Sequence, residues 1–158
     1  MRLNQGVEWA LHGCVDLAWL PEGTTVPIGR LAEYHDLPAA YLNKQFQALA
    51  RNGVVVSRAG PRGGFALARP AAEITVLDVV DAIEGREPVF RCLEIRQRGP
   101  FPASPQACQV PCEITSVMRG AEVAWRAELT ATTVATIADD VARAHPTVPT
   151  RVRDWFLA

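Results

Sequence analysis

The chain has 158 residues, of which 49% are apolar and 21% charged, and this balance is typical of a globular domain able to bury a substantial core. It contains neither an apolar run long enough to cross a bilayer nor the basic and apolar regions of a signal peptide, so we expect a cytoplasmic protein rather than a membrane or secreted one. The net charge of −1 hides a split, because residues 26–70 carry six basic and two acidic side chains, whereas residues 71–150 carry seven and eleven. One basic segment on an otherwise acidic chain favours a polyanionic partner.

Residues 1–85 predict three helices, a hairpin and a fourth helix. Apolar spacing predicts helices over 3–20, 27–35 and 39–51, the last closed by Asn52-Gly53. Residues 54–58 and 64–68 predict two strands joined by a glycine-rich turn, and Thr75 is expected to cap a helix over 76–84. This order is that of a winged helix-turn-helix, so the expected fold class is mostly α with a small β-wing.

The third helix would lie in the major groove of double-stranded DNA, and the hairpin would place basic side chains on a phosphate or in a narrow minor groove. The alternative is a small α+β domain whose polar helix face is only solvated. A polar third helix and a basic hairpin at this spacing favour DNA binding. The candidate contacts are Tyr41, Asn43, Lys44, Gln45 and Gln47 on the helix, and Arg58 and Arg62 on the hairpin.

Residues 86–110 form a proline-rich stretch without periodicity, and a loop this long in a small domain is functional or disordered. From 111 to 144, apolar residues recur every three or four positions and predict one helix of roughly 30 residues, about 45 Å long. No comparable element of the chain would bury this stripe, so a second subunit would cover it. We therefore expect a DNA-binding domain (1–85), a loop (86–110), a dimerisation helix (111–144) and a tail (145–158).

The four cysteines are too few for a disulfide scaffold, and clustered cysteines in a reducing compartment more often bind metal or perform redox chemistry. Cys108 and Cys112, in CQVPC, would form a two-ligand claw for an iron–sulfur cluster or zinc, although they also fit two ordinary part-buried cysteines. Cys14 lies on the apolar face of the first helix and is expected in the core.

Glu8 and His12 are four residues apart in EWALH and share a helix face, with Trp9 beside them. They are either a surface ion pair or part of a site whose other ligands lie elsewhere, since the same spacing lets two histidines share zinc. An enzymatic acid–base role is disfavoured, because the chain has no oxyanion loop, phosphate-binding glycine turn or Ser/His/Asp set.

The stretch from Tyr41 to Gly85 resembles the core of the Rrf2 family of winged-helix regulators. The likeness is carried by the Tyr-Leu opening of the third helix, the GPRGGF wing, Leu-Ala-Arg, and ITVLDVV followed by Glu-Gly, and it spans roughly residues 3–142. The resemblance implies a homodimer that binds an inverted-repeat operator. In many members of the family, cysteines just before the dimerisation helix hold an iron–sulfur cluster.

The cysteine spacing departs from the family pattern of three closely spaced cysteines, since fifteen residues separate Cys92 from Cys108 and three separate Cys108 from Cys112. EWALH together with CQVPC is similar to a redox-sensing member of the family. That resemblance implies a [2Fe–2S] cluster held by Glu8 and His12 of one chain and by Cys108 and Cys112 of the other, which switches the DNA binding of a repressor. Trp9 would act as a redox relay. The alternatives are a [4Fe–4S] sensor of nitric oxide or oxygen that uses Cys92, Cys108 and Cys112, and a metal-free thiol regulator.

Overall fold

The computed structural model describes residues 3–60 and 63–158, and the chain forms two compact units that we describe separately. The larger unit comprises residues 3–86 and 129–158, and the smaller unit comprises residues 87–128. Among the described residues, no helix is both long and apolar enough to span a membrane.

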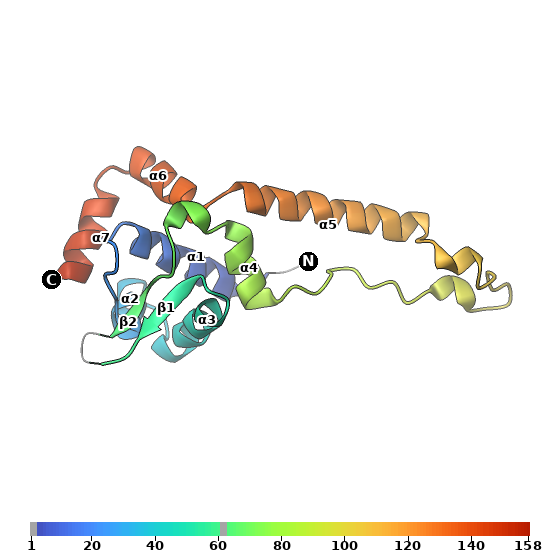
Figure 1. Cartoon of the computed structure of the whole chain (residues 1–158), viewed down its shortest axis with the longest axis horizontal. Helices are drawn as coiled ribbons and strands as arrows, with labels where there is room; N and C mark the ends of the chain where they lie inside the picture. Colours follow the sequence, from blue (N-terminus) through green and yellow to red (C-terminus); the bar gives the residue numbers. More distant parts are fainter. Residues whose placement is uncertain (1–2, 61–62) are drawn as a thin grey trace. The chain divides into compact units, whose positions relative to one another are not determined.

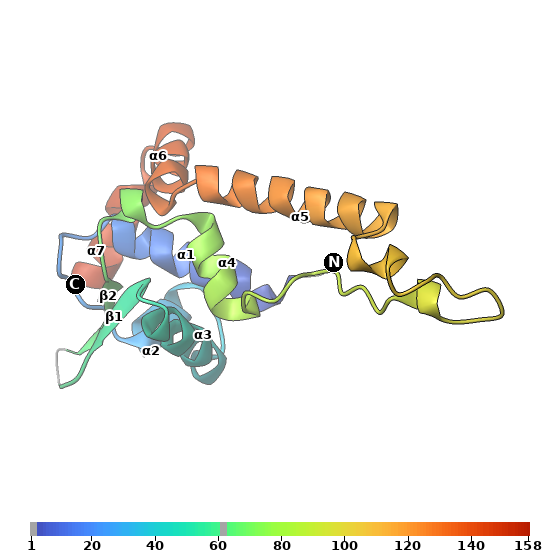
Figure 2. The same ribbon diagram turned by 45° about the vertical axis from the view of Figure 1, so that its right-hand side comes forward.

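The larger unit is a winged helix-turn-helix (Figure 1). Its N-terminal part consists of α1 (Gln5–Ala18), α2 (Ile28–Tyr34), α3 (Ala39–Arg51), the strands β1 (Val55–Arg58) and β2 (Gly64–Leu67), the 3-10 turn η1 (Ala71–Glu73) and α4 (Val76–Glu84). The strands are antiparallel, with Val55 opposite Leu67, and both views show them beside α3 (Figures 1 and 2). The expected fold class is therefore confirmed.

The core of the larger unit is centred on α3. The Phe46 side chain is fully buried and its ring meets that of Phe65 edge-on, with 5.2 Å between the ring centroids. α1 packs directly against it, since a Cβ atom added to Gly13 would lie only 2.5 Å from the Phe46 ring. The backbone of α1 therefore rests on α3 with no room for a side chain between them.

The expected single helix over 111–144 is wrong, because the chain forms α5 (Glu113–Ala131) and α6 (Val134–Ala144). At the break, the backbone turns to pair with the segment before α4. The Val76 N–H donates to the Thr132 carbonyl at 2.9 Å, and the Val134 N–H donates to the Ile74 carbonyl at 2.8 Å. Thr133 caps α6 by accepting a hydrogen bond from the Thr136 N–H. Apolar periodicity continues across this break and so concealed it.

The C-terminal part of the chain completes the larger unit. α6 packs against α1, and its Val134 side chain is fully buried. Residues 145–158, for which the sequence showed no pattern, form α7 (Val148–Leu157). The ring of the α7 residue Phe156 packs at a tilt of 50° against Tyr34, with 5.2 Å between centroids, and the Arg30 guanidinium lies 4.8 Å from the centre of the Trp155 ring. α7 therefore packs against α2 through these two contacts.

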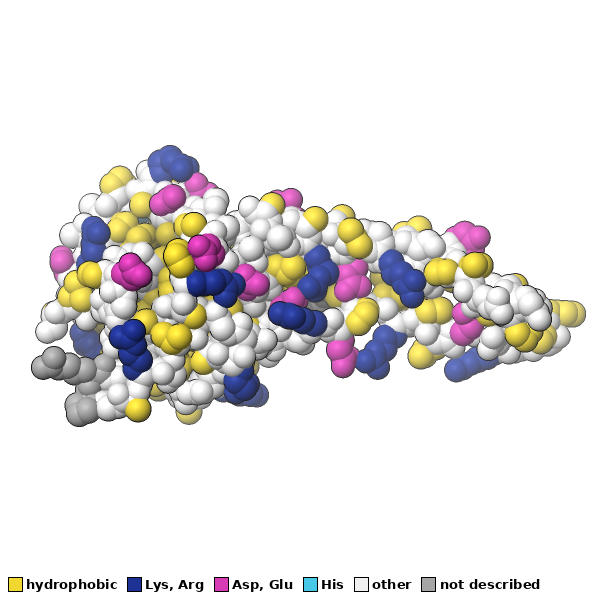
Figure 3. All heavy atoms as spheres, in the orientation of Figure 1, with side chains coloured by type: hydrophobic (Ala, Val, Ile, Leu, Met, Phe, Trp, Pro, Cys, Tyr) yellow, Lys and Arg dark blue, Asp and Glu magenta, His cyan; other side chains and the backbone are white. Residues whose placement is uncertain are grey.

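The smaller unit contains the turns η2 (Ile95–Gln97) and η3 (Ala107–Gln109) and most of α5. Figure 3 shows apolar side chains exposed among charged ones on its surface. Because such side chains normally favour burial, this surface suits contact with another molecule. The exposed large apolar residues of this unit are Val89, Leu93, Ile95, Phe101, Val110, Ile114, Val117, Met118 and Val123.

Candidate metal centre and nucleic-acid interface

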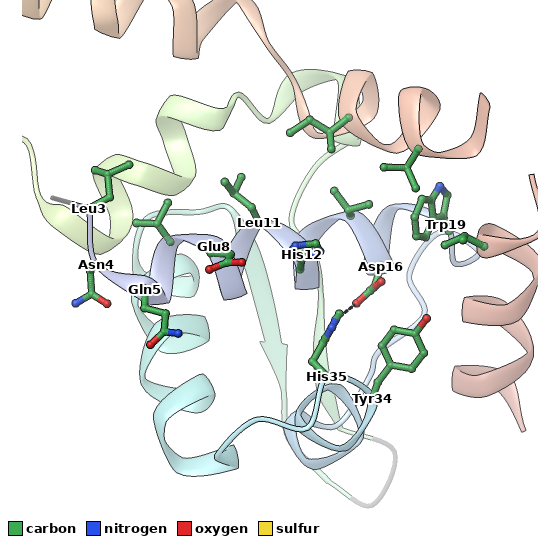
Figure 4. Close-up of a pocket in the computed structure, with 15 residues that line it drawn as sticks. Leu3, Asn4, Gln5, Glu8, Leu11, His12, Asp16, Trp19, Tyr34 and His35 are labelled. Carbon is green, nitrogen blue, oxygen red and sulfur yellow. Dashed lines mark hydrogen bonds and ion pairs between the residues drawn. The ribbon is translucent and has the colours of Figure 1, made fainter. Parts of the chain in front are cut away.

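One face of α1 carries a row of ionisable side chains. Glu8, His12 and Asp16 follow one another at intervals of four residues and line a cavity of about 650 Å³ (Figure 4). Glu8 and His12 are exposed, whereas Asp16 is buried. The predicted pairing of Glu8 and His12 on one face is thus present, and both can reach a ligand or metal from outside the unit.

Asp16 is joined to His35, which follows the last residue of α2. The Asp16 Oδ2 atom lies 2.5 Å from Nε2 of His35, and only 6% of the Asp16 side chain is exposed. Burial raises the pKa of Asp16, and the hydrogen bond and charge of His35 oppose that rise. The His35 ring also lies 5.7 Å from the His12 ring, between centroids. This pair, which the sequence did not reveal, connects the face of α1 to the helix-turn-helix.

Two of the three cysteines of the smaller unit, Cys108 and Cys112, lie where the loop enters α5. Cys112 directly precedes α5, and its Sγ atom lies 3.4 Å from Oγ1 of Thr115. This hydrogen bond, and then backbone N–H groups at the start of the helix, lower the pKa of the Cys112 thiol. Cys108 lies in η3 and, like Cys112, is a half-buried free thiol. A lowered pKa at Cys112 favours the thiolate, which is the form that binds metal.

The other two cysteines have contrasting surroundings. Cys92 is an exposed free thiol. Cys14 is fully buried, which confirms its expected place in the core, and burial raises the pKa of its thiol to about 12. A thiol held in this protonated form is unsuited to metal binding.

The candidate ligands form two pairs, one in each unit of the chain: Glu8 with His12, and Cys108 with Cys112. Within the part of the chain that the structure describes, no group of three or more His, Cys, Asp or Glu side chains is arranged to hold a metal ion. Each pair therefore offers two donors, and their chemistry fits an iron–sulfur cluster because thiolate and imidazole are both known cluster ligands.

The polar face of α3 is largely available to DNA. Lys44 and Gln47 are exposed, and Asn43 is half-exposed. Gln45 is only 4% exposed and faces α1, so the expectation that it points outward is wrong. The reason is Gly6, whose missing side chain leaves the space that the Gln45 amide fills.

On the wing, the Arg58 side chain is exposed, and its guanidinium lies 3.3 Å from the Gly23 carbonyl. Arg62, the second predicted wing contact, lies outside the described residues.

Tyr41 links the start of α3 to α1. Its ring meets the Trp9 ring edge-on, with 5.2 Å between centroids. Its hydroxyl donates to Oδ1 of Asn4 at 3.2 Å, and the same Asn4 oxygen caps α1 by accepting from the Gly6 N–H. Tyr41, a candidate DNA contact, is therefore in direct contact with Trp9, which lies beside the candidate metal ligands Glu8 and His12 on α1.

Residues 3–140 match the model of the Rrf2 family, described as iron-dependent transcriptional regulators. The chain belongs to the Rrf2 family. It is 33% identical over 92 residues to the HTH-type transcriptional regulators IscR of Cronobacter sakazakii (strain ATCC BAA-894) and Escherichia coli (strain K12 / DH10B). This match covers 58% of the chain and 57% of each relative, so it spans little more than half of their length. The family consists of transcriptional regulators rather than enzymes, as the sequence led us to expect.

Solved structures share the fold. IscR of T. potens superposes with a TM-score of 0.65 at 21% identity, covering 92% of this chain and 91% of that one. The oxidized form of CymR from Staphylococcus aureus superposes with a TM-score of 0.63 at 22% identity, covering 87% and 96%.

Proposed function

We propose that the chain is a homodimeric DNA-binding repressor whose affinity for an inverted-repeat operator changes with the redox state of a [2Fe–2S] cluster. Glu8 and His12 of one copy and Cys108 and Cys112 of the other would hold the cluster. When bound, the cluster supplies reversible one-electron chemistry, and imidazole in place of thiolate raises its potential. Among the described residues these donors form two pairs in separate units of the chain, so a site to which each of two copies contributes one pair accounts for all four ligands.

The observation that carries this proposal is the position of α1 between the candidate ligands and α3. The exposed face of α1 carries Glu8 and His12. Its buried face meets α3 so closely that Gly6 and Gly13 have no room for a side chain. Since packed helices shift as rigid elements, a displacement of α1 moves the helix that would enter the major groove.

Trp9 and Tyr41 provide a second connection. A change of one unit of charge beside Glu8 and His12 alters the force on both side chains, and Trp9 follows Glu8 in the same helical turn. Trp9 contacts Tyr41, whose hydroxyl is held by the cap residue Asn4. A change at the ligands is thereby passed to the first turn of α3. Asn43, Lys44, Gln47, Arg58 and Arg62 would make the contacts with DNA.

The homodimer is supported by the exposed apolar side chains of α5 and of the loop before it. Ile114, Val117 and Val123 are each more than two-thirds exposed within one chain. A helix from a second copy would bury them, and at about 25 cal/mol per Å² of apolar area this burial favours association.

The decisive experiment compares the operator affinities of the oxidised and the dithionite-reduced protein. A DNA duplex is first selected from random sequences by the wild-type protein, and anaerobic gel shifts are then run at one fixed salt concentration. We expect at least a tenfold difference in affinity, equivalent to about 1.4 kcal/mol of coupling. Equal affinities in a protein with two irons and two sulfides per chain would refute redox switching.

Alanine substitutions distinguish the proposed four ligands from the alternative set of three cysteines. Glu8→Ala, His12→Ala, Cys108→Ala and Cys112→Ala are each expected to destroy or alter the visible spectrum of the cluster. Cys92→Ala serves as the matched control and leaves the spectrum unchanged. Loss of the cluster in Cys92→Ala, with a normal cluster in Glu8→Ala, would instead support a [4Fe–4S] site built on three cysteines.

A further inference from the structure

The side chain of Arg96 joins three parts of the loop that precedes α5. Its guanidinium donates to Oε1 and Oε2 of Glu94 at 2.7 and 3.0 Å. It also donates to the carbonyl of Ala107 at 3.3 Å and to that of Val110 at 3.2 Å. These two carbonyls lie on either side of Cys108, and Val110 is two residues before Cys112. One side chain thus holds the backbone between the candidate cysteine ligands.

The backbone of Arg96 makes a further contact with the loop. Its carbonyl accepts a hydrogen bond from the Ala103 N–H at 2.7 Å. The only regular elements between the end of α4 and the start of α5 are the two short 3-10 turns, so few backbone hydrogen bonds support this stretch. Hydrogen bonds of Arg96 therefore hold together residues of the loop that no helix or strand supports.

The pair of Glu94 and Arg96 is itself held in a demanding geometry. Glu94 has a φ of 49° and a ψ of 51°, a left-handed conformation that is unfavourable for a non-glycine residue. Its carboxylate is bonded to Arg96, and 31% of the Glu94 side chain and 27% of the Arg96 side chain are exposed. The same guanidinium is also bonded to the cysteine segment, so only part of the Arg96 side chain faces solvent.

The charge of Arg96 is as relevant as its hydrogen bonds. Its hydrogen bond with Glu94, followed by the charges of Glu94, Cys108 and Cys112, raises the pKa of the Arg96 guanidinium above its ordinary value. A permanent cation bonded to carbonyls within two residues of both cysteines stabilises added negative charge there.

From this geometry we infer that Arg96 is a positioning residue for the ligand pair Cys108 and Cys112, and that its charge raises the reduction potential of the cluster they hold. The inference rests on the proposed function, because it assigns Arg96 a role toward that cluster. Arg96 would not itself be a ligand, since a guanidinium has no lone pair to offer.

The test uses the full-length protein with Arg96→Gln, Arg96→Lys and Glu94→Gln, and with Arg91→Gln as the matched control. Arg91 lies in the same loop and pairs only with Glu87 among the contacts described, with both side chains at least 70% exposed. The first readout is hydrogen exchange of the metal-free protein over residues 104–112. Arg96→Gln and Arg96→Lys should both exchange several-fold faster than the wild type, because neither side chain can reproduce the fork to two carbonyls and a carboxylate.

The second readout is the reduction potential of the assembled cluster, followed by its visible spectrum. Arg96→Gln should change the ratio of reduced to oxidised cluster about tenfold toward the oxidised form at a given potential, a fall of about 59 mV for one electron. Arg96→Lys, which keeps the charge, should lie nearer to the wild type. Glu94→Gln should shift the potential the opposite way, because it removes a negative charge.

The outcomes distinguish this inference from the proposed function. A wild-type protein that takes up no cluster would refute the proposed function, and the exchange rates would still test the positioning role of Arg96. A wild-type protein with a normal cluster, and an Arg96→Gln variant that matches Arg91→Gln in both exchange and potential, would overturn the inference. Shifts of the same sign in Arg96→Gln and Glu94→Gln would also overturn it, since they would indicate general disruption rather than charge.

Discussion

Substitution of Gly13 by alanine tests whether α1 is locked onto α3. A Cβ atom at this position would lie 2.5 Å from the Phe46 ring, whereas carbon atoms in contact are about 3.5–4.0 Å apart. The Phe46 side chain is fully buried and has no solvent into which it can swing. We therefore assign the overlap a cost at the upper end of the overpacking range, about 3 kcal/mol.

Against this cost stands the higher helix propensity of alanine, which contributes about 1 kcal/mol. The net expectation is a loss of about 2 kcal/mol, or about 4–8 °C in melting temperature for a chain of this length. Melting should be followed at one fixed protein concentration, because dimerisation makes it concentration-dependent.

The matched control is Gly29→Ala in α2, where an added Cβ meets nothing within 4 Å. It should be neutral or stabilising by up to about 1 kcal/mol. Phe46→Leu in the Gly13→Ala background should recover part of the loss, with a coupling energy of about 0.5–3 kcal/mol. A Gly13→Ala protein as stable as the wild type would show that α1 can shift freely over α3, and the mechanical link proposed between them would fail.

Three further predictions concern buried or hydrogen-bonded ionisable groups. Because the pKa of the Cys14 thiol is raised from its ordinary 9.0 to about 12, its stabilising contribution is complete below pH 9 and is lost as the pH rises toward 12. In urea denaturation the wild type should therefore lose stability about 1.4 kcal/mol per pH unit more steeply than Cys14→Ala over this range, and parallel slopes would contradict the reasoning. His35→Ala should lower the free energy of unfolding by about 1–3 kcal/mol at pH 7, because it leaves the carboxylate of Asp16 buried without its partner. Asp16→Asn keeps a hydrogen bond and should lower the free energy of unfolding less. A larger loss in Asp16→Asn than in His35→Ala would be incompatible with a buried charge. Thr115→Val should slow alkylation of Cys112 by iodoacetamide in the metal-free protein at pH 7.5, since removal of the hydroxyl raises the pKa of the thiol, and an unchanged rate by mass spectrometry would rule this out.

The elements that the sequence predicted well are those with local signals at their ends. The bounds of α4 match the prediction because Thr75 and Asp78 form a capping box and Gly85 follows with a φ of 87°. The bounds of α3 match as well, with Asn52 as its C-cap and Gly53 in a left-handed conformation. The break between α5 and α6 was missed because its cause is a pairing with residues almost sixty positions earlier.

The candidate site likewise has features that local sequence signals predicted and features that depend on contacts between helices. Glu8 and His12 share a face because helix geometry fixes neighbours four residues apart, so a short motif was sufficient to pair them. The burial of Gln45 depends on the absence of a side chain at Gly6, a contact between two helices that the pattern of α3 alone does not contain. The bond between Asp16 and His35 likewise joins α1 to the end of α2, and no periodicity within either helix indicates it.

These contacts give α1 a position that suits a sensor. Along its length it meets α3 through Gly6, Gly13 and Trp9, and it meets the end of α2 through Asp16. Both helices of the helix-turn-helix are thus attached to the helix that exposes Glu8 and His12. In the proposed function, a ligand bound at that face would act on both helices of the helix-turn-helix rather than on one of them. Because no loop intervenes between the candidate ligands and these contacts, a rigid shift of α1 alone would carry the proposed signal.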